Sequence, residues 1–220
     1  MKDIANDSIN LIVTDPPYKT ITGGNSDGVN SKRPQGMLEG NRKLFKYQKL
    51  NISDWMSELY RVLKDGSHCY IMTNSLNMEE MLVQSRKVGF KLHNILVWEK
   101  NNCTPSQFYM KNCEYTLFLR KGKAKWINDI GGSKTVHKFN NIIGKKTHPC
   151  EKPTDLLQFY ISNSIQDKNL DVVFDPFMGT GSCGIACCNL GIKNFIGIEL
   201  DDTYFEIAKN RIKNYKNKPN

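Results

Sequence analysis

Two short stretches of the chain have a composition that suggests a reactive or ligand-binding site. The first is Asp15-Pro16-Pro17-Tyr18, which directly follows an apolar run over 9–14. The β-branched side chains of that run predict a buried strand, and the prolines end it because proline cannot donate a ladder hydrogen bond. Asp15 is therefore expected at the end of a strand, where its carboxylate could accept hydrogen bonds from a ligand.

An exocyclic amine of a nucleobase suits this stretch as a substrate. Such an amine is a weak nucleophile because its lone pair is delocalised into the ring. Asp15 could accept one N–H of the amine, and the rigid Pro16-Pro17 pair could fix the carbonyl of Pro16 as a second acceptor. Tyr18 could stack on a base rotated out of a duplex. The structural alternative is a strand terminator in which Asp15 only caps the turn.

The second stretch is a strand that passes through a glycine turn into a helix: Val172-Val173-Phe174-Asp175-Pro176-Phe177-Met178-Gly179-Thr180-Gly181-Ser182. Glycines allow positive φ and close approach of a ligand, and a helix N-terminus offers free N–H groups. Glu199 ends the next predicted strand, where an acidic residue could accept both hydroxyls of a ribose. The alternative is a tight turn that merely joins two elements.

Three features of this turn favour a particular ligand. The third glycine of the dinucleotide fingerprint is missing, and no Gly-Lys-Ser/Thr follows to form a P-loop. Asp175 would also repel a phosphate. An adenosine ligand with a cationic centre and no phosphate fits these constraints, which favours S-adenosylmethionine as the cofactor.

Predicted helices and strands alternate along the chain and hold both stretches in place. Helical spacing of apolar residues and strand-like runs predict helices over 53–63, 77–88, 154–165, 182–190 and 202–215, and strands over 9–14, 68–73, 92–98, 115–119, 171–175 and 194–199. This alternation predicts an α/β fold with a mostly parallel sheet and ligands at the carboxyl ends of the strands. We expect one domain over 1–220, with a polar loop insertion at about 19–51.

Composition limits the class of protein and its partners. The net charge of +9 fits a polyanionic partner such as DNA, because lysine and arginine release counterions from phosphates. The seven cysteines form no paired Cys-x-x-Cys motifs, so reduced thiols and no metal site are expected. No apolar run reaches the roughly 18 residues of a membrane span, and the N-terminus lacks a signal-peptide segment, so a cytoplasmic protein without membrane contact is predicted.

The two stretches together resemble the β-group of amino-methylating DNA methyltransferases, which act on N6 of adenine or N4 of cytosine. Residues 12–18 are similar to their catalytic motif and residues 174–182 to their cofactor motif, in the order of that group. Further similar segments are Glu58 to Gly66, His148-Pro149-Cys150-Glu151-Lys152-Pro153, and Ile196-Gly197-Ile198-Glu199 with Tyr204, Ala208 and Arg211.

The resemblance implies a Rossmann-like, mostly parallel seven-stranded sheet with helices on both faces and one reversed strand. It assigns the target base to Asp15, Pro16, Pro17 and Tyr18. It assigns S-adenosylmethionine to Asp175, Pro176, Phe177, Gly179, Thr180, Gly181 and Glu199, with Lys152 near its carboxylate. Double-stranded DNA is the implied partner, and a homodimer is compatible with the group.

Two departures from the group's pattern affect these expectations. Members usually carry a Gly-Asp pair and an extra strand before the catalytic motif, for which the residues before Asp15 are too few, so the predicted sheet allows for the loss of one N-terminal strand. The target-recognition segment, expected at about 120–148, is short. Within it, Trp126 among lysines is a candidate for base stacking, and His137 for phosphate contact.

The sequence therefore predicts a site-specific adenine-N6 DNA methyltransferase of a restriction-modification type. Asp rather than Ser at position 15 favours adenine. Methylation of cytosine N4, methylation of RNA or of a protein amide, and a non-catalytic DNA-binding remnant that has lost its cofactor remain as alternatives.

Overall fold

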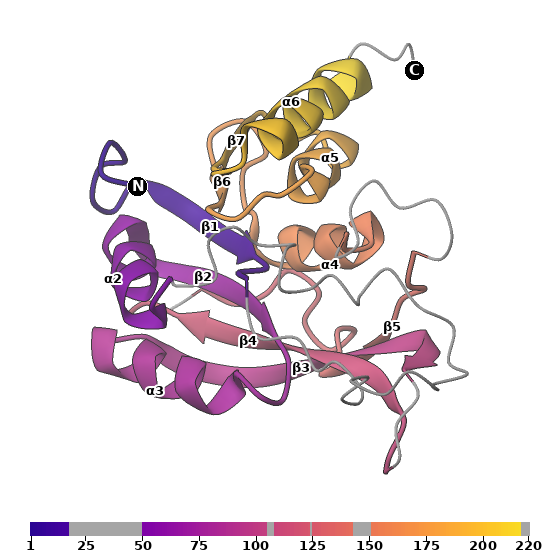
Figure 1. Cartoon of the computed structure of the whole chain (residues 1–220). Coiled ribbons are helices and arrows are strands. Elements are labelled where there is room, and N and C mark those ends of the chain that lie inside the picture. Colours follow the sequence, from indigo (N-terminus) through magenta and orange to yellow (C-terminus); the bar gives the residue numbers. More distant parts are fainter. Residues whose placement is uncertain (18–49, 105–107, 124, 143–150, 217–220) are drawn as a thin grey trace.

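The fold is built on a seven-stranded sheet in the order β5-β3-β4-β2-β1-β6-β7 (Figure 1). The computed structural model describes residues 1–17, 50–104, 108–123, 125–142 and 151–216. The strands are β1 (Ile9–Thr14), β2 (Leu63–Thr73), β3 (Lys91–Thr104), β4 (Lys111–Arg120), β5 (Val136–Lys138), β6 (Val172–Asp175) and β7 (Asn194–Gly197). The helices are α2 (Ile52–Val62), α3 (Met78–Val88), α4 (Thr154–Ser164), α5 (Ser182–Asn189) and α6 (Asp202–Lys216).

Among these strands, β4 alone runs against its neighbours. It pairs antiparallel with both β2 and β3, whereas β1 pairs parallel with β2 and β6, β6 with β7, and β3 with β5. The carboxyl ends of the parallel strands therefore meet along one edge, here called the carboxyl edge. The predicted α/β architecture with one reversed strand is confirmed.

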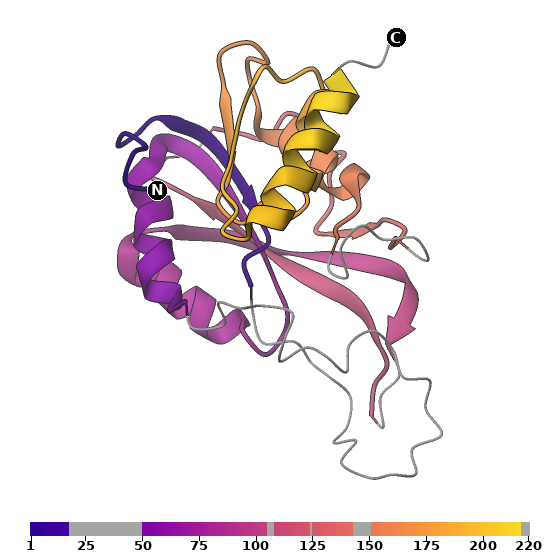
Figure 2. The ribbon, with the colours of Figure 1, turned by 45° about the horizontal axis from the view of Figure 1, so that its top comes forward.

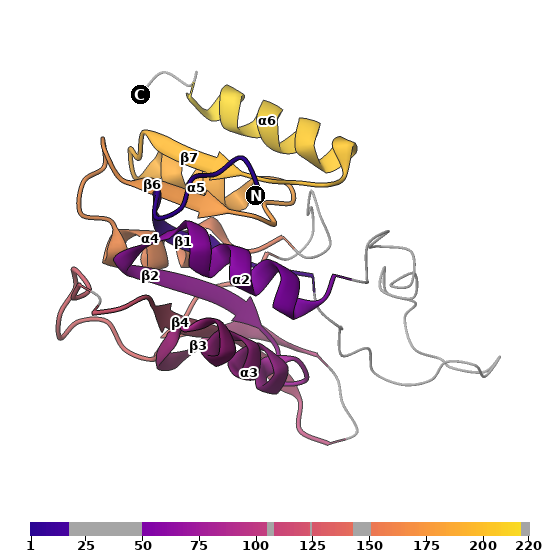
Figure 3. The same cartoon turned by 90° about the vertical axis from the view of Figure 1, so that its left-hand side faces the viewer.

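Helices cover both faces of the sheet, as Figures 2 and 3 show. One buried cluster joins the sheet to α4 and α5, and a second joins it to α2 and α3. Leu11 and Val13 of β1 lie in the first cluster and Ile12 in the second, because successive side chains of a strand point to opposite faces. Both faces of β1 are thus buried, as its continuous apolar run predicts.

The strands β3 and β4 are longer than their hydrophobic patterns predicted. They form a hairpin that extends to Thr104 and from Lys111, beyond the predicted 92–98 and 115–119. Beyond the pair of Glu99 with Cys113 the register shifts before Thr104 pairs with Lys111, so the apolar pattern marked only the part of each strand that reaches the core. The short β5 was not predicted from the sequence. Within the described residues, β7 is the last strand on its side of the sheet.

None of the helices in these described ranges is both long and apolar enough to cross a membrane.

A glycine at the end of α3 meets a strict local requirement. Gly89 has φ +108°, and a Cβ there would lie 2.9 Å from Cζ of Tyr60. Gly191, after α5, also has positive φ (+73°) but has nothing within 4 Å of its Cβ position.

We expect Gly89→Ala to destabilise the fold by about 1–3 kcal/mol, because it combines backbone strain with a clash. Gly191→Ala, the matched control, should cost only about 1 kcal/mol from strain. Urea unfolding of both variants measures the two free energies, and equal losses would show that the contact with Tyr60 adds nothing.

Candidate active site at the carboxyl edge

The two chemical stretches meet at the carboxyl edge of the sheet. Strands β1 and β6 are parallel neighbours, with Leu11 opposite Val173 and Ile12 opposite Phe174. This register brings the end of one strand beside the end of the other. Thr14 Oγ1 donates a buried hydrogen bond of 2.7 Å to Oδ1 of Asp175. Asp15 therefore leaves the sheet directly beside the glycine turn.

The carboxyl group of Asp175 is buried in this junction. Its Oδ1 accepts hydrogen bonds from Thr14 Oγ1 and from the backbone N–H of Phe177 at 3.1 Å. Burial raises the pKa of Asp175 from 3.8 to about 7, because desolvation outweighs those two hydrogen bonds, and the nearby charges of Asp15 and Glu199 add to the increase. The group thus titrates near neutral pH.

The turn after Asp175 has the open backbone that its glycines predict. Gly179 has φ +51° and no atom within 4 Å of its Cβ position, so space for a ligand lies beside it. Gly181 has φ +85° and precedes α5, and a Cβ there would lie 3.0 Å from Cβ of Ala208 in α6. The first glycine leaves room outside the turn, whereas the second permits close helix packing. Pro176 and Thr180 are buried beneath the turn, and Phe177 is partly exposed.

Glu199 lies beside this turn, just after β7. Its Oε2 accepts the backbone N–H of Gly179 at 2.9 Å, and its Oε1 accepts the N–H groups of Leu200 and Asp201. The carboxylate is thereby held in one orientation against the open side of the turn. The structure thus brings together Asp175, the glycines and Glu199, which the sequence had grouped by motif.

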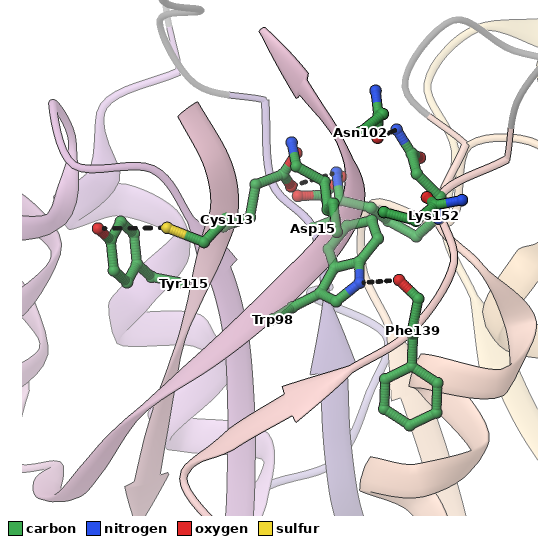
Figure 4. A network of polar contacts seen from close by, with 11 residues as sticks. Asp15, Trp98, Asn102, Cys113, Tyr115, Phe139 and Lys152 are labelled. Carbon is green, nitrogen blue, oxygen red and sulfur yellow. Dashed lines mark hydrogen bonds and ion pairs between the residues drawn. The ribbon is translucent and has the colours of Figure 1, made fainter. Parts of the chain in front are cut away.

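Asp15 is held by a lysine from a distant segment. Lys152 Nζ lies 2.5 Å from Oδ2 of Asp15, and their side chains are only 10% and 22% exposed (Figure 4). Pro16 is buried and Pro17 partly buried, while Tyr18 lies outside the described residues. The sequence had placed Lys152 near a cofactor carboxylate. In the structure this ammonium group contacts the proposed catalytic carboxylate.

The ion pair continues into the β3–β4 hairpin. Lys152 Nζ also lies 3.5 Å from Oε2 of Glu114 in β4, whose Oε1 is 3.0 Å from Nζ of Lys100 in β3. Burial opposes ionisation of Glu114, but the two ammonium groups outweigh it and hold the pKa of its carboxyl below the ordinary value. Sequence reasoning missed Glu114 and Lys100, because only the pairing of β3 with β4 shows that they are neighbours.

A second ion pair links Glu151, the residue before Lys152, to the glycine turn through Arg211. Glu151 Oε1 lies 2.6 Å from Nη2 of Arg211 in α6, and Nη1 of the same arginine donates to the backbone and hydroxyl oxygens of Thr180. Two adjacent residues thus contact both motifs. Glu151 pairs with the arginine that bonds to Thr180 of the glycine turn, and Lys152 pairs with Asp15. The similarity of the Glu151-Lys152 segment to known enzymes was the available signal, but the partner of Glu151 was not predicted.

Two candidates for nucleic-acid contact lie elsewhere. The backbone of Lys125, next to Trp126, bonds to Gly66 and His68, which lie at the edge opposite to Asp15. Trp126 therefore lies away from Asp15, because β4 runs antiparallel and delivers the following residues to the far edge. His137 Nε2 lies 2.9 Å from the hydroxyl of Tyr160, and burial lowers the pKa of His137, so its side chain packs against α4 in this structure.

The predicted recognition segment at about 120–148 crosses the molecule. It begins at the far edge after Arg120, returns through β5 beside β3, and leaves the described residues after position 142. The insertion at about 19–51 lies outside the described residues except at its end. Within the described ranges the cysteines are free thiols, and no group of three or more His, Cys, Asp or Glu side chains is placed to hold a metal ion.

The raised pKa of Asp175 predicts a pH-dependent stability. Between about pH 4 and pH 7 the folded protein binds a proton that the unfolded chain lacks, so this group's contribution to stability falls as pH rises through that window. Asp175→Asn keeps an Oδ1 acceptor for Thr14 and Phe177 but cannot ionise. We expect the free energy of unfolding of the wild type, relative to this variant, to fall from pH 5 to pH 8.

Urea unfolding at pH 5, 6, 7 and 8 measures that difference. Burial lowers the pKa of both His68 and His137, but both proteins contain these histidines and their effects cancel in the comparison. A difference that is constant with pH would contradict the shifted pKa of Asp175.

Comparison with known proteins agrees with this geometry. A family model described as DNA methylase, for N6 and N4 methyltransferases, matches residues 9–210. The chain is 28% identical over 244 residues to the Type II methyltransferase M.HinfI of Haemophilus influenzae, covering 100% of this chain and 67% of that protein. It is 27% identical to M2.DpnII of Streptococcus pneumoniae, covering 94% of this chain and 83% of that protein.

Solved structures show the same fold. The M1.HpyAVI–SAM complex superposes with a TM-score of 0.67 at 26% identity, covering 96% of this chain and 90% of that one. The cytosine-N4-specific PvuII DNA methyltransferase superposes with a TM-score of 0.69 at 16% identity, covering 98% and 87%. The chain belongs to the family of S-adenosylmethionine-dependent DNA methyltransferases that modify N6 of adenine or N4 of cytosine.

Proposed function

We propose that this chain is a site-specific DNA methyltransferase that transfers a methyl group to N6 of adenine in double-stranded DNA. It would act as a single methyltransferase domain in a restriction-modification setting. The observation that carries this proposal is the hydrogen bond from Thr14 to Asp175, which places Asp15 beside the glycine turn. A carboxylate for the base and an open turn for the cofactor then face the same edge.

The residues around the turn fit S-adenosylmethionine, which supplies a methyl group on a sulfonium cation when bound. Gly179 leaves open space at the turn, and the Glu199 carboxylate borders it as an acceptor for ribose hydroxyls. The carboxyl group of Asp175 favours a cationic ligand over a phosphate when it is ionised. Lys152 lies at the same edge, and its predicted contact with the cofactor's carboxylate is part of this proposal.

Asp15 and Pro16 would handle the amine of the target base. The Asp15 carboxylate would accept one N–H and the carbonyl of Pro16 the other, so that the nitrogen lone pair turns toward the methyl donor. Lys152 holds Oδ2 of Asp15 and compensates its charge within the partly buried site. Proximity and orientation then supply most of the rate increase. Tyr18 is proposed to stack on the extruded base.

Adenine is favoured over cytosine by the residue at position 15. Asp rather than Ser stands at that position, and by resemblance to the group's catalytic motif this favours adenine. Cytosine N4 is the second candidate, because its amine needs the same pair of acceptors.

Nucleoside mass spectrometry tests the reaction and the base together. The protein is incubated with mixed-sequence duplex DNA and methyl-labelled S-adenosylmethionine, and the DNA is then digested. We expect label in N6-methyladenine. Label in N4-methylcytosine instead would overturn the choice of base. Absence of label together with no calorimetric binding of S-adenosylmethionine would overturn the enzyme assignment in favour of a DNA-binding remnant.

A substitution at Asp15 tests the mechanism. We expect Asp15→Ala to lower turnover by at least about a hundredfold, because the amine loses its charged acceptor. Glu206→Ala, which removes an exposed carboxylate on α6, is the matched control and should keep full activity. Initial rates with labelled cofactor provide the measurement, and circular dichroism verifies folding. Turnover retained by Asp15→Ala would refute the role of this carboxylate.

A further inference from the structure

Three consecutive large apolar side chains are exposed between β3 and β4. Phe108, Tyr109 and Met110 are 89%, 94% and 62% exposed. Exposed aromatic side chains side by side in the sequence often mark a surface that binds a partner. They belong to the hairpin of residues 100–104 and 108–114, here called the β3–β4 arm.

The β3–β4 arm projects from the carboxyl edge, beyond Asp15. Thr14 lies opposite Ile71 of β2, and the next residue of β2, Met72, lies opposite Thr116 of β4. Asp15 is therefore level with Thr116. Strand β4 begins further out at Lys111, about 17 Å beyond that level at the usual rise per residue. Figure 1 shows β3 and β4 running past the other strands on this side.

The base of the arm is tied to the active site. Lys100 and Glu114 stand at its base, and through Lys152 they are linked to Asp15 by consecutive ion pairs. Figure 4 shows this region, with Asp15 and Lys152 beside the strands of the arm. These partly buried ion pairs thereby hold the base of the arm in place relative to Asp15.

The segment that follows β5 braces the β3 side of the arm. The backbone N–H of Asn141 donates to Oδ1 of Asn101, and its side-chain amide donates to Oδ1 of Asn102. Closer to the centre of the sheet, Trp98 Nε1 donates to the backbone oxygen of Phe139. A braced hairpin can present apolar side chains at a fixed distance from Asp15, which an unsupported loop could not.

The charges of the arm suit a nucleic acid. Glu114, at the base of the arm, is paired with Lys100 and Lys152. Beyond that pair, between Asn101 and Cys113, Lys111 is the one charged residue of the sequence, so no carboxylate there repels phosphate. Apolar and aromatic side chains inserted between base steps stabilise the gap and the kink that open in a duplex. Removing one base from the stack leaves such a gap beside the enzyme that holds it.

We propose that Phe108, Tyr109 and Met110 form a wedge that enters the DNA duplex at the target base pair and stabilises the extruded state. This inference rests on the proposed function. It assigns a DNA-insertion role to the β3–β4 arm, in addition to the recognition segment that the sequence predicted after position 120. The wedge stacks on the bases that remain in the duplex, while Asp15 binds the amine of the extruded base.

The test compares two substitutions of exposed aromatic residues. The double variant Phe108→Ser/Tyr109→Ser removes the wedge, and Trp126→Ser removes an aromatic side chain of similar exposure (78%) at the opposite edge. The substrates are a duplex oligonucleotide carrying the target base mapped from labelled genomic DNA, and the same duplex with that base mispaired. Readouts are kcat/KM, the fluorescence of 2-aminopurine placed at the target, and calorimetric binding of S-adenosylmethionine.

We expect the double variant to lose about tenfold or more in kcat/KM on the paired duplex, with a smaller rise in 2-aminopurine fluorescence on binding. On the mispaired duplex it should return to within about threefold of the wild type, because a mispaired base costs less to extrude. Trp126→Ser should match the wild type on both duplexes. Cofactor binding should be equal in all three proteins.

Two results would overturn the wedge. One is a double variant as active as the wild type on the paired duplex, and the other is an equal loss on both duplexes, which would indicate general DNA contact. Methyl transfer by the wild type tests the proposed function separately. An active wild type with unaffected wedge variants therefore rejects this inference alone.

Discussion

The active site depends on the parallel pairing of β1 with β6 and on the hydrogen bond that closes it, from Thr14 to Asp175. The two residues are 161 positions apart in the chain, and both are buried. Water therefore cannot take the place of either hydrogen-bonding partner. A register shift of one residue would turn Thr14 to the other face of the sheet and leave the Asp175 carboxyl without this partner. The apolar faces of β1, buried on both sides, resist such a shift. The position of Asp15 beside the glycine turn follows from that register.

Charge at the carboxyl edge is arranged in alternating pairs. Asp15, Lys152, Glu114 and Lys100 form one chain of opposite charges, and each partly buried ion is compensated by its neighbour. Lys152 belongs to a dipeptide whose preceding carboxylate binds Arg211 of α6, so one short segment before α4 holds both the catalytic motif and the glycine turn in place. Among the described residues no cation is paired with the buried Asp175, and desolvation raises its pKa, whereas two ammonium groups lower that of Glu114.

The direction of β4 determines which surfaces can face DNA. Because this strand runs against the others, the connection that precedes it lies at the carboxyl edge and the one that follows it lies at the far edge. The exposed aromatic residues Phe108 and Tyr109 therefore share an edge with Asp15, whereas Trp126 does not. The lysines around Trp126 had made it a candidate for base stacking in the sequence. Position in the sheet, and not local composition, separates the two groups.

Local sequence patterns predicted the element types, the carboxyl ends of β1 and β6, and the grouping of Asp175, Gly179, Gly181 and Glu199. These features depend on local causes, namely apolar periodicity, prolines that end a strand and glycines that permit positive φ. The tertiary structure decided the partners of Lys152, the roles of Glu114 and Lys100, the length of the β3–β4 arm and the displacement of Trp126 to the far edge. Those outcomes depend on which strands are neighbours, in which direction and in which register, and such long-range pairing leaves no periodic signal in the residues that it brings together.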